Sequence, residues 1–168
     1  MSDDAAADLF AEVSQQLLAV LTVALPDWAE QCVRTRVAQY VDALDAEPEV
    51  SAAGSFREPG AVDDAVASAR RGVSAEIVEL GRLLTADVDG QRTNPLHIVR
   101  EAVRHPTAAL HRLDVPSVVR DQHAERLHPG DVYDLMPTSF ADVGASVGEV
   151  GLAWGAAKVI AHRSRHEA

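Results

Sequence analysis

Residues 93–120 read TNPLHIVREAVRHPTAALHRLDVPSVVR, and this stretch decides how the chain folds. Asn94 suits the N-cap of a helix, and Pro95 suits its first position, where a missing amide proton costs no hydrogen bond. Pro106 must break or restart that helix, because its ring clashes with the preceding turn. Pro116 then ends it, since the residue before a proline disfavours helical dihedrals. The stretch therefore predicts two short helical pieces.

Longer helices are predicted on both sides of this stretch. Over residues 61–86 apolar side chains recur at spacings of three and four, which predicts one long helix. Near the C-terminus, Ser146 followed by Glu149 has the spacing of a capping box that opens a last helix. A strip of glycines predicts close packing of that helix against the one at 61–86; its members are Gly144, Gly148, Gly151 and Gly155.

The N-terminal third predicts a helical hairpin over residues 1–45. Apolar residues recur at helical spacing up to Pro26, and Asp27 with Glu30 has capping-box spacing for a second helix. We therefore expect a turn near residues 25–27. Residues 46–60 lose this periodicity and predict a flexible acidic linker, followed by a helical core domain over residues 61–168. The predicted fold is all-α, an irregular helical bundle.

The composition limits the classes of function. The chain has 168 residues, 47% of them apolar but only seven aromatic, which favours packing between helices. A net charge of -11 opposes binding to nucleic acid or to an anionic membrane surface. Cys32 is the single cysteine, so no internal disulfide can form. The acidic N-terminus is unlike a signal peptide, and the uncharged run at 13–26 is too short to span a bilayer, so we expect a cytoplasmic protein.

Two groups of side chains could hold a metal ion. His97, Glu101 and His105 share one helical face, but the outer two lie about 12 Å apart at 1.5 Å per residue, too far to share an ion. A second group lies within residues 121–134, where loops of this type can supply nitrogen and oxygen ligands. The candidate ligands there are His123, Glu125, His128 and Asp131, although Asp131 and His128 also suit a helix cap and a β-turn.

No catalytic or cofactor motif is recognisable, because the chain contains no phosphate-binding loop, nucleophile elbow or paired zinc-ligand motif. The sequence therefore favours a non-enzymatic protein–protein interaction or regulatory protein. The alternative is a metal- or small-ligand-binding protein, or an enzyme, that uses the cluster at 121–134. A third possibility is a homodimer in which N-terminal hairpins pair. We expect the interaction surface in an apolar irregular segment, at Tyr133, Leu135, Met136 and Phe140.

Five segments in the C-terminal part carry a resemblance to a known family. They are NPL at 94–96, RHPTAAL at 104–110, VPSVVRD at 115–121, DVYDLMPTSFADV at 131–143 and GLAWGAAK at 151–158. This part of the chain, roughly residues 94–165, resembles a family of small, uncharacterised helical proteins of actinobacteria. The resemblance implies a GC-rich source and an intracellular setting. It implies no activity and no site residue, because that family carries no assigned function.

Overall fold

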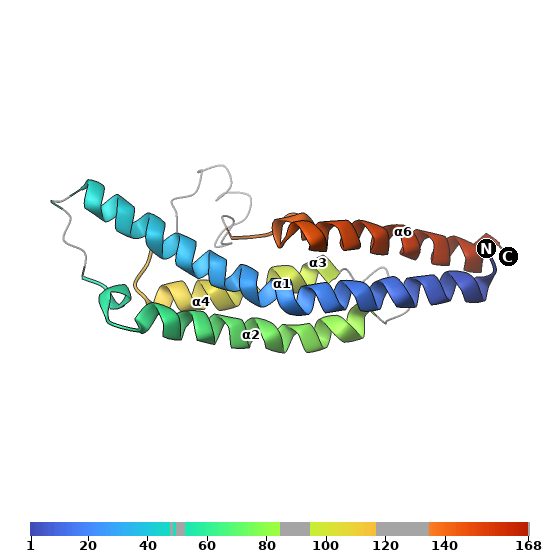
Figure 1. The fold of residues 1–168 in the computed structure, drawn as a ribbon, viewed down its shortest axis with the longest axis horizontal. Helices are drawn as coiled ribbons and strands as arrows, with labels where there is room; N and C mark the ends of the chain where they lie inside the picture. Colours follow the sequence, from blue (N-terminus) through green and yellow to red (C-terminus); the bar gives the residue numbers. More distant parts are fainter. Residues whose placement is uncertain (48, 50–52, 85–94, 117–134, 168) are drawn as a thin grey trace. The chain divides into compact units, whose positions relative to one another are not determined.

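The computed structural model describes residues 1–47, 49, 53–84, 95–116 and 135–167, and these residues form helices without a strand (Figure 1). The all-α prediction is therefore confirmed. In chain order the elements are α1 (Asp3–Ala46), the 3-10 helix η1 (Ser55–Arg57), α2 (Ala61–Leu84), α3 (Pro95–Glu101), α4 (Arg104–Arg112), the 3-10 helix η2 (Phe140–Asp142) and α6 (Ala145–Glu167).

The predicted N-terminal hairpin is wrong. α1 is a single helix of 44 residues that continues through Pro26. A proline inside a helix costs about 3 kcal/mol, but tertiary packing can offset that cost. Here the apolar side chains immediately before and after the proline, Leu25 and Trp28, are both buried. Because buried side chains lie on both sides of Pro26, packing favours a helix that continues through the proline. The homodimer suggested from the sequence was based on this hairpin, which α1 does not form.

The chain divides into two compact units. The first unit comprises Met1–Pro26, Ser74–Glu101 and Pro137–Ala168, and the second comprises Asp27–Val73 and Ala102–Met136. Each unit thus contains one part of α1 and one part of α2. The predicted linker at residues 46–60 lies inside the second unit.

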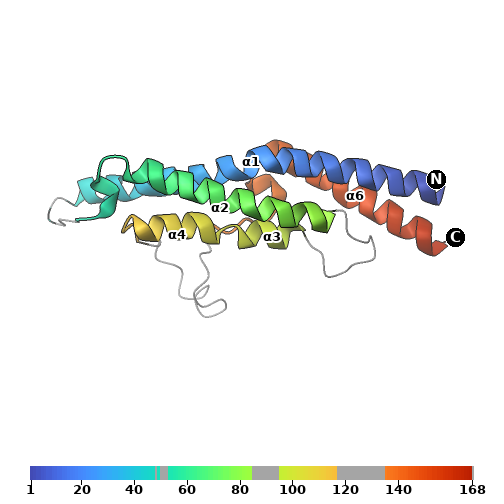
Figure 2. The ribbon, with the colours of Figure 1, turned by 90° about the horizontal axis from the view of Figure 1, so that it is seen from below.

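In the first unit, α6 lies beside the first part of α1 and runs antiparallel to it (Figure 1, Figure 2). Two contacts fix this direction. The ring of Trp154 lies 5.9 Å from that of Phe10, and the Ser164 hydroxyl donates a hydrogen bond to Asp3. The side chains of Leu17 and Leu21 are fully buried in this unit. α2 also belongs to it from Ser74 onwards.

In the second unit, the first part of α2 contacts both α4 and the second part of α1. Arg112 of α4 donates a 2.8 Å hydrogen bond to Ser68 of α2. Gly72 faces His105 so closely that a Cβ atom at position 72 would collide with the imidazole ring. This close approach explains a glycine inside the predicted long helix at 61–86, which is confirmed as α2 over the described residues.

Residues 95–116, the described part of the stretch 93–120, contain two helical pieces, as predicted. The break falls at residues 102–103, and Pro106 lies in the first turn of α4, where the missing amide proton costs nothing. After α4 the backbone of Asp114 is left-handed, with φ of 58°. Its carboxylate accepts hydrogen bonds from the backbone and hydroxyl of Ser55, which lower the Asp114 pKa. Asn94 lies outside the described residues.

The predicted capping box at Ser146 and Glu149 is wrong. α6 begins at Ala145, so Ser146 already lies inside its first turn. The capping box that the structure contains is formed by Ser139 and Asp142, and it opens η2. Both pairs have the same spacing, and the sequence offered no basis for preferring the earlier one.

Candidate interaction surface

The segment 137–144 enters α6 through a tightly held turn. The Asp142 carboxylate accepts hydrogen bonds from the hydroxyl of Thr138 at 2.7 Å and from its backbone at 2.8 Å, and a third from the backbone of Ser139 at 3.1 Å. These donors, the Thr138 hydroxyl first, lower the pKa of Asp142. Before the turn, Arg100 of α3 donates to the carbonyl of Pro137 at 3.1 Å. The segment is therefore held by its own hydrogen bonds and by α3.

Two glycines of the C-terminal strip provide space for η2. A Cβ atom at Gly151 would lie 2.5 Å from the ring of Phe140, and one at Gly148 would lie 2.9 Å from the Cα of Ala141. The predicted packing of these two glycines against the helix at 61–86 is therefore wrong, because η2 occupies their side of α6. By contrast, a Cβ atom at Gly155 would meet nothing within 4 Å.

An apolar groove of about 590 Å³ lies where α3, η2 and α6 meet in the first unit. Three large apolar side chains define it, Leu96 of α3, Phe140 of η2 and Leu152 of α6. The hydroxyl of Thr138 also lines it but is already bonded to Asp142. The remaining lining residues are Ser139, Ala141, Ala145, Gly148, Glu149 and Gly151. Apolar lining with few polar groups suits an apolar partner.

A second apolar surface runs along α6 and meets this groove at Leu152. We call it the outer face of α6, and all of its members are exposed: Glu149, Leu152, Ala153, Ala156, Val159, Ile160 and Arg163. At 3.6 residues per turn they lie within about 60° of Ala156 on either side. Leu152 is 80% exposed, Val159 50% and Ile160 38%. The buried residues of α6 lie on the opposite side of the helix: Val147, Gly151, Trp154, Ala157 and Ala161.

The outer face carries charge only at its two ends. Between Glu149 and Arg163 the only Asp, Glu, Lys or Arg is Lys158. The Lys158 ammonium lies 5.3 Å from the ring centroid of Trp154, a cation–π contact on the other side of the helix. The middle of the outer face is therefore uncharged over about three turns of helix.

The structure brings one of the predicted surface residues to this site. Phe140 is half-buried, packs on Gly151 and lines the groove. Leu135 and Met136 are half-buried and do not line it. Tyr133 lies outside the described residues. Sequence reasoning missed Leu152, and with it Val159 and Ile160. The available signal was that residues 150–161 are apolar apart from Lys158, so more than one side of the helix is apolar.

The residues of the predicted metal cluster lie outside the described residues: His123, Glu125, His128 and Asp131. Within the described part of the chain, no three His, Cys, Asp or Glu side chains are placed to hold one ion. His97 lies 3.8 Å from Glu101, and both side chains are exposed. That pair therefore lies on a solvated face of α3.

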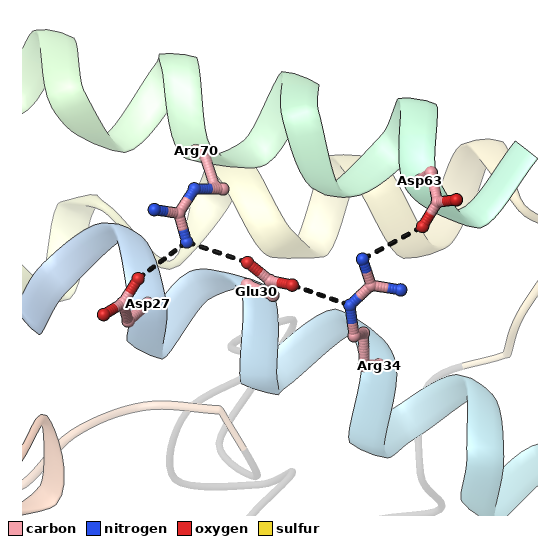
Figure 3. A network of polar contacts seen from close by, with 5 residues as sticks. All are labelled: Asp27, Glu30, Arg34, Asp63 and Arg70. Atoms are coloured by element: carbon pink, nitrogen blue, oxygen red, sulfur yellow. Dashed lines mark hydrogen bonds and ion pairs between the residues drawn. The ribbon is translucent and has the colours of Figure 1, made fainter. Parts of the chain in front are cut away.

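The second unit contains a chain of five charged side chains between α1 and α2 (Figure 3). Arg70 contacts both Asp27 and Glu30 at 2.8 Å, and Arg34 contacts Glu30 at 2.8 Å and Asp63 at 3.0 Å. The pKa of Glu30 is lowered, chiefly by its hydrogen bond with Arg34. The pKa of Arg70 is raised chiefly by Asp27, and the pKa of Arg34 is raised chiefly by Glu30. The network joins two helices, and its five side chains are between 32% and 75% exposed. We interpret it as a structural feature.

α1 contains a stretch that is long and apolar enough to cross a membrane, judged by length and composition alone. Core helices of soluble proteins and N-terminal signal sequences pass the same test, and 39% of this stretch is buried in the structure. The chain matches no protein-family model, no curated protein and no solved structure. The fold and the surface therefore define an all-α protein with an exposed apolar helix face.

Proposed function

We propose that this is a non-enzymatic, cytoplasmic protein–protein interaction protein, and that it binds through the outer face of α6 and the adjoining groove. One observation carries the proposal. Leu152 is 80% exposed and belongs to both surfaces, so the groove and the outer face form one continuous apolar patch. Soluble proteins expose single apolar residues freely, but a continuous apolar patch marks a site of interaction.

The free energy of burial supports a protein as the bound species. Fully burying a leucine, isoleucine or valine side chain stabilises a complex by about 1.5–3 kcal/mol. Leu152, Val159 and Ile160 follow one another along about two turns of helix, so one apolar helix could cover all three. The charged residues at the ends, Glu149 and Arg163, would form the polar rim that surrounds the apolar centre of many interfaces.

Chemical cross-linking of the full chain in a native lysate, followed by mass analysis, tests this function. The Leu152→Glu variant places a charge in the centre of the patch. Val78→Glu is a matched control, because Val78 is a 63% exposed helical residue of the first unit outside the patch. We expect wild type and Val78→Glu to give the same cross-linked species, and Leu152→Glu to lose it. Identical products from all three proteins, or no product from any, would contradict the proposal.

A further inference from the structure

We infer that the outer face of α6 binds the same face of a second copy of this chain, with the two helices antiparallel and the two-fold axis at Ala156. The inference rests on the proposed function and names the partner.

The charged ends of the outer face are placed symmetrically about Ala156. Glu149 lies seven residues before it and Arg163 seven residues after it. In an antiparallel pair centred on Ala156, Glu149 of each copy therefore lies opposite Arg163 of the other, which gives two ion pairs. A parallel pair would instead place like charges together, and a shift of one turn would leave both charges unmatched. Charge complementarity thus selects the antiparallel orientation and this register.

The apolar residues follow the same symmetry. Leu152 and Ile160 lie four residues before and after Ala156, so each copy places its leucine opposite the isoleucine of the other. Ala153 and Ala156 are small, which lets two helix axes approach to about 10 Å at the centre. Lys158 faces Trp154 on the far side of the helix, so pairing would bury no unmatched charge.

The groove extends this contact beyond the helix pair. Leu152 lines the groove, and antiparallel pairing places the C-terminal turns of the second copy beside it. The outer face alone is about 21 Å long, and a stable interface of ordinary size buries about 800 Å² on each partner. One helix face provides less than that, even with the groove added. We therefore expect a dimer that dissociates in roughly the micromolar range.

Sedimentation equilibrium of the full chain tests the inference over about 1 µM to about 1 mM, the range in which interfaces of this strength dissociate. The wild-type mass should rise from 17.9 kDa towards twice that value. Glu149→Arg and Arg163→Glu should each raise the dissociation constant about tenfold or more, because each change replaces two attractions by two repulsions. The double variant restores opposite charges and should restore dimerisation. Leu152→Glu should remain a monomer, and Val78→Glu should behave as wild type.

A wild-type mass of one chain at every concentration would overturn the inference, as would a dimer that Leu152→Glu leaves intact. A double variant as weak as the single ones would exclude this register. Failure here is distinguishable from failure of the proposed function. If the wild type is a monomer but Leu152→Glu still loses a cross-linked protein, the surface binds a different protein. In that case the proposed function stands, and only the identification of the partner as a second copy of this chain is wrong. Circular dichroism of each variant verifies that the helices are retained, and the charge reversals lie at exposed positions.

Discussion

The indole N–H of Trp154 donates a hydrogen bond to the hydroxyl of Ser14, across a distance of 3.1 Å. Both groups are buried, with Ser14 2% and Trp154 8% exposed. The bond joins α6 to α1 and fixes which side of α6 faces the core. Because each residue advances about 100° around a helix, turning Trp154 inward places Ala156 about 160° away, towards the outside. The exposed apolar face of α6 is thus set by this buried pair.

Ser14→Ala should destabilise the protein by about 1–3 kcal/mol, because it leaves the buried indole N–H without its acceptor. Urea denaturation followed by circular dichroism measures the change. Ser146→Ala is the control, since Ser146 is an exposed serine of α6 and its replacement should alter the unfolding free energy by less than about 0.5 kcal/mol. Equal effects of the two substitutions would show that the bond to Trp154 contributes nothing to stability.

Two glycines of α6 should respond to alanine with opposite signs. At Gly148 a Cβ atom would lie 2.9 Å from the backbone of Ala141, so Gly148→Ala should displace η2 and lower the melting temperature. At Gly155 nothing lies within 4 Å, so Gly155→Ala should stabilise the helix by up to about 1 kcal/mol. Differential scanning calorimetry compares the two. A stabilised Gly148→Ala would mean that η2 does not rest on α6 as described.

The charged network of the second unit should make stability depend on acid pH. The folded-state pKa of Glu30 is lowered, chiefly by Arg34, so its contribution is present above the ordinary carboxyl pKa of about 4. That contribution is lost as the pH falls through the lower, folded-state value. Arg34→Gln should therefore reduce stability slightly near neutral pH and flatten the decline below about pH 4.

Thermal melts between neutral and acid pH compare Arg34→Gln with Arg71→Gln, an exposed arginine of α2 outside the network. The difference between the two variants should shrink in about 1 M salt, because exposed ion pairs are screened. A pH profile of Arg34→Gln identical to that of the control would exclude a contribution from the Glu30 pKa.

Much of the helical architecture could be predicted from local signals. The apolar stripe of α2 has one clear face, and Pro95 and Pro106 show that the next helix is broken. Pro26 misled the prediction, because the penalty for a proline inside a helix is local whereas the burial that offsets it is tertiary. Leu25 and Trp28 are the buried apolar side chains on either side of Pro26, and they could be assigned to the core only from the fold.

The site was harder to predict than the fold. Phe140 was expected at an interaction surface and lines the groove. Leu152 was missed, because α6 is apolar on both sides and periodicity alone cannot say which side is covered. That choice depends on the contact of Trp154 with Ser14, two residues 140 positions apart in sequence. The glycines of α6 were expected to mark close packing, which is correct at Gly148, although η2 is the element that lies against it.

Disulfide cross-linking at Ala156 tests the central claim, the self-pairing of the outer face of α6, most directly. In a Cys32→Ser background, Ala156→Cys places the only thiol of each chain at the proposed two-fold axis, within reach of a disulfide. Ala153→Cys is the control, since its two thiols would lie about 9 Å apart along the helix direction. We predict rapid oxidation of Ala156→Cys to a covalent dimer and little dimer from Ala153→Cys. No dimer from Ala156→Cys, or equal amounts from both variants, would contradict the account.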